Sequence, residues 1–214
     1  EQVMAYILYF ARRVDLQSAD MHDHCWNSRL MPGAKNHTIG LVGFGGIGTE
    51  VAKRAVPFGM KVIYFCRHPN PADDAAYGVQ SVSMEELLKE SDYVVAAVPL
   101  TDQTFHLFNE ERIAQMKAGS VLINIARGPV VDEEALAQAL ASGHLGGCAV
   151  DVFPKEPCTN SVLTRYANAL LTPHSATSTA ENSKAANFAA ANNLVNYLKK
   201  DIDAKYVVVQ GTRY

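Results

Sequence analysis

Short apolar runs alternate with polar or helix-forming stretches along most of this chain. The runs are rich in Val, Ile, Leu and Ala, and their length is that of strands buried on both faces, as a parallel sheet requires. They lie at residues 39–42, 61–65, 93–98, 121–125, 148–150 and 169–171, with a further short strand expected at 79–82. Because such runs alternate with helical segments, the pattern predicts an α/β fold class with a doubly wound parallel sheet.

The helices between these runs are marked by apolar spacing, by Ser or Asp at their starts, and by Pro or Gly at their ends. They are predicted at residues 3–11, 47–56, 109–116 and 133–141, with a short helix after Ser83 and a long one from Ser178 to about Lys200. Two polar stretches, 15–35 and 70–78, are predicted to be loops. Phe105, Phe108 and Met116 are expected in the core, and Cys148 is expected to be a small buried hydrophobe.

The stretch after the first predicted strand is rich in glycine and opens a helix. Gly43, Gly45 and Gly48 fit the G-x-G-x-x-G fingerprint. The first glycine allows a sharp turn, the second lets backbone approach a pyrophosphate, and the third lets the helix pack close to the strand. A pyrophosphate would lie on the unpaired N–H groups at the helix start, where the helix dipole favours negative charge. This context predicts a Rossmann NAD(P)-binding fold.

The end of the second predicted strand bears on the choice of cofactor. NAD-binding folds place an Asp or Glu there to accept hydrogen bonds from the ribose 2′-hydroxyl, whereas this strand ends in Cys66-Arg67-His68. A guanidinium at this point suits the 2′-phosphate of NADP. We therefore expect NAD(P)H as the cofactor, with NADPH favoured. The alternative is that Arg67 stacks on adenine or points to solvent.

Composition and charge narrow the range of partners. The chain has 214 residues, 48% of them hydrophobic, and a net charge of −3, so neither nucleic acid nor a membrane is expected as a partner. No apolar run approaches the roughly 18 residues of a membrane helix, and no signal peptide is expected. The cysteines form no C-x-x-C pair, which favours free thiols and a cytoplasmic location. No metal site is predicted at His22, His24 and Cys25, because histidines two residues apart do not share a helix face and no further ligand cluster is evident.

Three ionisable residues follow three separate predicted strands. Arg127, Glu156 and His174 are distant in sequence, yet the carboxyl ends of parallel strands would bring them to the edge that carries the glycine turn. His can supply a proton near neutral pH, and a carboxylate partner keeps the imidazole charged. Arg can bind a carboxylate through two hydrogen bonds and polarise the adjacent carbonyl. The set suits hydride addition to a 2-oxo acid, although each residue alone could equally be structural or lie on the surface.

Five ordered segments resemble the nucleotide-binding domain of the D-isomer-specific 2-hydroxyacid dehydrogenase family. They are residues 43–48, 98–101, 123–132, 146–157 and 171–174, and the similarity runs from about Gln2 to Leu198. The resemblance implies an oxidoreductase that transfers a hydride between NAD(P)H and a small 2-oxo acid, such as glyoxylate or hydroxypyruvate. Glu156 favours the hydroxyacid branch of the superfamily over the formate dehydrogenases.

The same resemblance implies roles for individual residues. Arg127 would bind and polarise the 2-oxo acid, His174 would be the acid/base, and Glu156 would be its partner. Asp151 would hold the nicotinamide carboxamide. The remaining residues implied to line the cofactor, besides Arg127 and His174, are Gly43, Gly45, Gly46, Ile47, Gly48, Cys66, Arg67, His68, Val98, Pro99, Thr104, Ile125, Ala126 and Ala176.

The expected organisation is an N-terminal helix and dimerisation arm at 1–35, a dinucleotide-binding domain at 36–200 and a C-terminal tail at 201–214. The family's substrate domain is expected to be missing from the chain. Family dimers form through the nucleotide-binding domain, so the resemblance implies a homodimer with Trp26 on its arm; the alternative for Trp26 is an intramolecular plug. Two functional alternatives stay open: a dinucleotide-binding regulator of the corepressor type, because such relatives keep the same three residues, and an inactive cofactor-binding fragment.

Overall fold

The computed structural model describes residues 1–203 and 206. Its contacts divide the chain into two units, Glu1–Ala176 and the segment that begins at Thr177. The first unit contains the sheet and both hydrophobic cores. The predicted C-terminal tail at 201–214 lies mostly outside the described residues.

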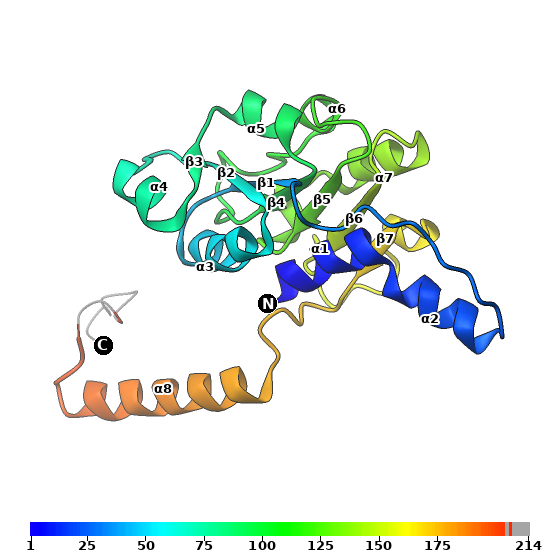
Figure 1. Cartoon of the computed structure of the whole chain (residues 1–214). Helices are drawn as coiled ribbons and strands as arrows, with labels where there is room; N and C mark the ends of the chain where they lie inside the picture. Colours follow the sequence, from blue (N-terminus) through cyan, green and yellow to red (C-terminus); the bar gives the residue numbers. More distant parts are fainter. Residues whose placement is uncertain (204–205, 207–214) are drawn as a thin grey trace. The chain divides into compact units, whose positions relative to one another are not determined.

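A seven-stranded parallel sheet forms the middle of the first unit, in the order β3-β2-β1-β4-β5-β6-β7 (Figure 1). The strands are β1 Thr38–Val42, β2 Lys61–Phe65, β3 Gln80–Ser81, β4 Tyr93–Ala96, β5 Val121–Asn124, β6 Gly147–Val150 and β7 Ala169–Leu171. The doubly wound parallel sheet predicted from the sequence is therefore confirmed. The strand order reverses between β1 and β4, and ligands of such sheets bind beyond the carboxyl ends of the strands at this point.

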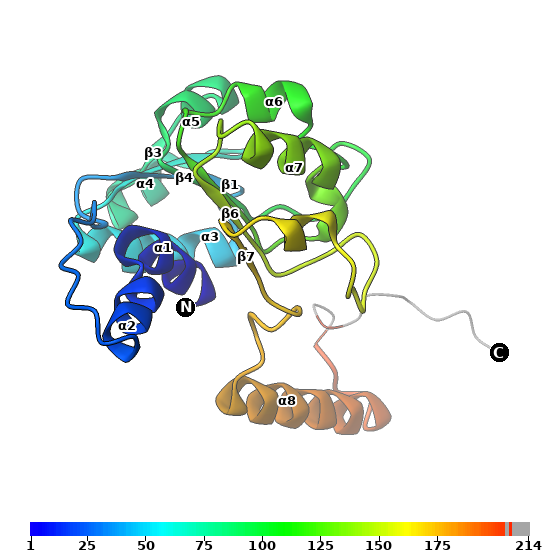
Figure 2. The same ribbon diagram turned by 90° about the vertical axis from the view of Figure 1, so that its right-hand side faces the viewer.

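Helices cover both faces of the sheet, as Figure 2 shows. They are α1 Gln2–Arg12, α2 Val14–His22, α3 Gly46–Ala55, α4 Pro71–Tyr77, α5 Met84–Glu90, α6 Glu110–Ala114 and α7 Glu133–Ala141, with short 3-10 turns η1 Val56–Phe58, η2 Gly128–Val130 and η3 Val162–Arg165. One core packs α5, α6 and α7 on the sheet around Phe108 and Leu122, and the other packs α1 and α3 around Ile7 and Ile39. Two of the predicted caps are confirmed: Ser83 Oγ accepts from Glu86 N at 3.1 Å, and Asp132 Oδ1 accepts from Glu134 N at 3.1 Å.

Two stretches predicted to be loops contain helices instead. The stretch 70–78 forms α4, which Asn70 caps by accepting from Ala72 N at 3.1 Å and which ends at Gly78 with φ 66°. The stretch 15–35 contains most of α2, none of whose residues is buried. Neither helix carries the wide apolar stripe by which longer helices are recognised, and this is why the pattern missed them.

The burial of five residues was also predicted or left open between alternatives. Phe108, Met116 and Cys148 are buried, as expected. The prediction for Phe105 is wrong: the residue is 57% exposed and stacks on the ring of His106 at 4.1 Å. Trp26 is 85% exposed, so the alternative that it plugs the interior of its own chain is also wrong.

The second unit contains α8, Ala180–Leu198. Thr179, rather than Ser178, is its cap and accepts from Asn182 N at 3.1 Å. None of its residues is buried, and Phe188, Leu194 and Leu198 are exposed along it. Over the described part of the chain, we find no helix with the length and apolar character needed to cross a membrane.

Candidate cofactor and active site

The glycine turn between β1 and α3 has the geometry that the fingerprint predicts. Gly43 has a φ of 103°, and a Cβ there would lie 2.4 Å from the carbonyl oxygen of Ala97. A Cβ on Gly48 would lie 2.5 Å from the carbonyl oxygen of Gly43. Both values are far below normal contact, so only glycine fits at these two positions.

Gly45 and Gly46 differ from these two glycines because both are exposed and a Cβ on either would meet nothing within 4 Å. Gly45 is the N-cap of α3, so the N–H groups of the next residues, Gly46, Ile47 and Gly48, lack partners within the helix. The result is an open backbone surface at a helix N-terminus, which fits a pyrophosphate.

The end of β2 lies beside this turn. Cys66 is half-buried, whereas Arg67 and His68 are exposed. The sequence did not indicate that Phe44 of the glycine turn stacks on Tyr64 of β2, with ring centres 4.1 Å apart. Tyr64 in turn donates a hydrogen bond to Asp74 of α4 at 2.8 Å. These contacts hold the glycine turn, β2 and α4 together at the end of β2.

The segment after β4 is held by the Thr104 hydroxyl. Its Oγ1 donates to the carbonyl oxygen of Pro99 at 2.6 Å and accepts from Thr101 N at 2.8 Å. Val98 is half-buried and Pro99 is exposed. Thr104 therefore shapes the loop at the carboxyl end of β4, next to the glycine turn.

Arg127 follows β5 in a turn that Asn124 organises. The side chain of Asn124 is buried; its Oδ1 accepts from Ala126 N at 3.1 Å, and its Nδ2 donates to the Arg127 carbonyl at 3.0 Å. Gly128 then packs so tightly that a Cβ would lie 2.0 Å from the carbonyl carbon of Phe153. Asn124 was not among the predicted site residues, although an amide at the end of an apolar strand is a usable signal of such a turn.

Glu156 and His174 meet across the gap between the segments that follow β6 and β7. His174 Nδ1 lies 2.6 Å from Glu156 Oε2, and Phe153 N donates to Glu156 Oε1 at 2.9 Å. The His174 hydrogen bond, followed by that from Phe153 N and the charges of His174 and Arg127, lowers the pKa of Glu156 below its ordinary value. Glu156 is therefore ionised at neutral pH. Among the described residues, the hydrogen bond of the His174 ring is made by Nδ1, and none is made to Nε2.

Asp151, at the end of β6, is 1% exposed and supports the segment that carries His174. Its Oδ1 accepts from Thr172 Oγ1 at 2.6 Å and from Ser175 N at 2.8 Å. Its Oδ2 accepts from Ala176 N at 3.0 Å. A carboxylate oxygen has two lone pairs, so Oδ2 retains the capacity to accept one further hydrogen bond.

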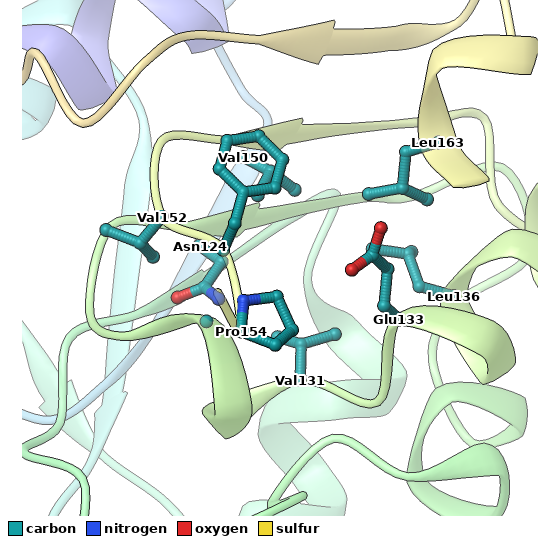
Figure 3. Close-up of a pocket in the computed structure, with 10 residues that line it drawn as sticks. Asn124, Val131, Glu133, Leu136, Val150, Val152, Pro154 and Leu163 are labelled. Atoms are coloured by element: carbon teal, nitrogen blue, oxygen red, sulfur yellow. The ribbon is translucent and has the colours of Figure 1, made fainter. Parts of the chain in front are cut away.

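A small, mostly apolar cavity lies behind the Arg127 turn (Figure 3). It has room for about one water molecule and is lined by Leu136, Val150, Leu163 and the side chain of Glu133, among others. Ser161 Oγ donates to the Glu133 carboxylate, which connects α7 to the loop after Glu156. The cavity is part of this packing and is far too small for a dinucleotide. The described residues contain no His, Cys, Asp and Glu group able to hold a metal ion.

The glycine turn, the Arg127 turn, Glu156 and His174 all follow carboxyl ends of parallel strands, so they lie at one edge of the sheet. With the strand reversal beside the glycine turn, this arrangement defines a Rossmann-type dinucleotide-binding domain.

Comparison with known proteins agrees with this fold and also identifies the family. Residues 4–176 match the family described as "D-isomer specific 2-hydroxyacid dehydrogenase, NAD binding domain". The chain belongs to this family.

Individual relatives match most of this chain but only part of their own length. A glyoxylate reductase from Thermococcus litoralis is 42% identical over 95% of this chain and 64% of its own length. Among solved structures, a glyoxylate reductase from Paecilomyes thermophila is 34% identical, with a TM-score of 0.82 and coverage of 92% of this chain and 60% of its own. A D-lactate dehydrogenase from Aquifex aeolicus, solved with NAD and lactic acid, is 31% identical, with a TM-score of 0.85 over 92% of this chain and 65% of its own.

Proposed function

We propose that the protein containing this chain is an NAD(P)-dependent oxidoreductase that reduces a small 2-oxo acid to a D-2-hydroxy acid. The observation that carries the proposal is the 2.6 Å pair between His174 Nδ1 and Glu156 Oε2, at the sheet edge that carries the glycine turn. The names of the glyoxylate reductases and of the D-lactate dehydrogenase among the relatives support a substrate of this class.

The chemistry assigned to each residue follows from its position. A bound nicotinamide supplies or accepts the hydride. His174 holds a proton at Nε2, directed at the carbonyl oxygen on which negative charge develops. Glu156 is ionised and accepts a hydrogen bond from Nδ1, which fixes the orientation of the imidazole ring. Arg127 is exposed and offers its guanidinium to the substrate carboxylate and the adjacent carbonyl.

The cofactor contacts are proposed on the same basis. The backbone of Gly45, Gly46 and Ile47 would carry the pyrophosphate, and the free lone pair of Asp151 Oδ2 would accept from the nicotinamide carboxamide. Arg67 is exposed at the end of β2, and no acid stands among residues 66–68, which favours NADPH over NADH. Fluorescence titration of the chain with each dinucleotide tests this preference. Tighter binding of NADH would overturn it.

Turnover of the full-length protein with a panel of glyoxylate, hydroxypyruvate, pyruvate and larger 2-oxo acids tests the activity. His174→Ala and Arg127→Ala should lose most of the turnover and still bind the dinucleotide. Wild-type rates in both variants would show that the roles are wrongly assigned. Intact dinucleotide binding without turnover on any 2-oxo acid would instead favour a dinucleotide-binding regulator.

A homodimer is proposed from the segment around α2. Val14, Met21, Trp26 and Leu30 are all strongly exposed there, and a row of exposed apolar side chains indicates an interaction surface. Sedimentation of the wild type and of Trp26→Ala tests this proposal: a wild type that is monomeric at micromolar concentration would contradict it. The cytoplasmic location predicted from the cysteines stays a proposal.

A further inference from the structure

A line of hydrogen bonds links the N-terminal helix to the segment that carries His174. Tyr6 of α1 is 2% exposed, and its hydroxyl is bonded to Thr172 Oγ1. Thr172 Oγ1 donates to Asp151 Oδ1 at 2.6 Å. Since the Thr172 hydroxyl has one proton and gives it to Asp151, Tyr6 must be the donor to Thr172. Burial raises the pKa of Tyr6, so the donor keeps its proton at neutral pH.

Asp151, where the line ends, binds the backbone N–H groups of His174 and of the two residues that follow it. The Asp151 carbonyl accepts from His174 N at 2.8 Å, and the two carboxylate oxygens accept from Ser175 N and Ala176 N. His174 has a φ of 52°, a conformation that non-glycine residues rarely adopt and that persists only when the surroundings enforce it. The hydrogen bonds from His174 N, Ser175 N and Ala176 N to Asp151 hold His174 in this conformation.

The Tyr6 hydroxyl is not needed for packing. Its neighbours on α1, including Val3 and Ile7, are apolar and buried in the same core, and a phenylalanine would fill nearly the same space. Burying a hydroxyl is unfavourable unless it makes a hydrogen bond, and the Thr172 bond supplies it here. The hydroxyl therefore points to a role beyond filling the core.

We infer that Tyr6 is a positioning residue for His174, acting through Thr172 and Asp151 from a helix that makes no contact with the substrate itself. The inference rests on the proposed function only where it concerns turnover. The mechanical part of the inference is that the Tyr6 hydroxyl stabilises the backbone conformation of His174, and it depends only on the observed geometry. The two parts are tested separately.

The first test needs no turnover. Tyr6→Phe removes one hydroxyl. Tyr9→Phe is the matched control because Tyr9 lies on the same helix and its ring contacts Arg13, whereas the hydrogen bond to Thr172 comes from Tyr6. We expect Tyr6→Phe to speed amide hydrogen exchange at Ser175 and Ala176 by roughly three- to ten-fold, as for loss of one hydrogen bond. It should also raise the pKa of Glu156, followed by carbon NMR, because the His174 pairing that lowers it is weakened.

Tyr9→Phe should change neither quantity, and Tyr6→Phe added to Thr172→Val should have no further effect. The inference is overturned if Tyr6→Phe leaves both quantities at wild-type values, or if Tyr9→Phe changes them equally.

The second test uses the full-length protein. Tyr6→Phe should lower kcat several-fold and change KM for the dinucleotide less than kcat, because the glycine turn proposed to hold the pyrophosphate is untouched. Unchanged kcat alongside faster exchange would overturn the role in positioning. An inactive wild type would count against the proposed function, and the exchange result would still decide the mechanical part.

Discussion

Exchanging single glycines of the turn between β1 and α3 separates folding from cofactor binding. Gly45→Ala adds a methyl group to an extended residue, with φ −90°, where nothing lies within 4 Å. The change should cost at most about 1 kcal/mol of stability, chiefly from a poorer N-cap. Gly43→Ala meets two obstacles, a φ of 103° and a carbonyl oxygen 2.4 Å from the new Cβ.

The magnitudes follow from these two geometries. A left-handed conformation costs a non-glycine residue roughly 1–2 kcal/mol, and forcing a methyl group into a packed site costs about 1–3 kcal/mol. Gly43→Ala should therefore lose about 2–5 kcal/mol, which lowers Tm by roughly 4–20 °C for a unit of this size. Gly45→Ala should lower Tm by no more than about 4 °C.

Dinucleotide binding should respond to Gly45→Ala far more than stability does. The methyl group of Gly45→Ala would stand between the backbone and the pyrophosphate. Loss of one hydrogen bond to a charged group, about 1.5–3 kcal/mol, weakens binding roughly ten- to hundred-fold. Thermal melting and fluorescence titration of the two variants beside the wild type give both quantities. Wild-type affinity in Gly45→Ala would refute the placement of the pyrophosphate, and wild-type stability in Gly43→Ala would refute the close approach to Ala97.

Three further predictions concern other parts of the first unit. Burial raises the pKa of Cys148 to about 12. A thiol reagent at pH 8 should therefore label the exposed Cys25 in the native protein and leave Cys148 unlabelled. Rapid labelling of both cysteines would contradict the burial of Cys148. Gly128→Ala should destabilise the protein by about 2 kcal/mol or more, because the new Cβ would lie 2.0 Å from the Phe153 carbonyl carbon. If the variant unfolds in urea at the same midpoint as the wild type, this close packing is ruled out. Folding lowers the pKa of Glu156, so the stability that this carboxylate contributes is present above its ordinary pKa and is lost as the pH falls through its lowered pKa in the folded protein. In melting curves measured against pH, Glu156→Gln should lack this loss of stability in acid. A wild type that loses no more stability in acid than Glu156→Gln would contradict the pairing with His174.

The parts of the fold that could be predicted from the sequence are those where the local backbone conformation or burial restricts which residue types fit. Gly43 must be glycine because its φ and its approach to Ala97 allow nothing else, so the fingerprint identified the turn. The apolar runs identified the strands because both faces of the sheet are covered. The position of Arg127, Glu156 and His174 at one edge followed from a general rule for parallel sheets.

Other features depended on contacts that no local pattern records. The helix α4 is seven residues long and buries no stripe, so its Asn70 cap and Gly78 end resembled a loop. Phe105 stacks on His106 at the surface, although its large apolar side chain favoured a place in the core. Tyr6 and Thr172 are 166 residues apart in sequence, and Tyr6 occupies a position that looks purely apolar.

The central claim is that one dinucleotide reaches from the start of α3 to the segment after β7. Titration of the isotope-labelled chain with NADPH or NADH, followed by amide NMR, tests it most directly. We predict that the amides of Gly46 and Ile47 and those of Ser175 and Ala176 shift together and yield the same dissociation constant. Shifts confined to one of the two groups, or two different dissociation constants, would contradict the claim.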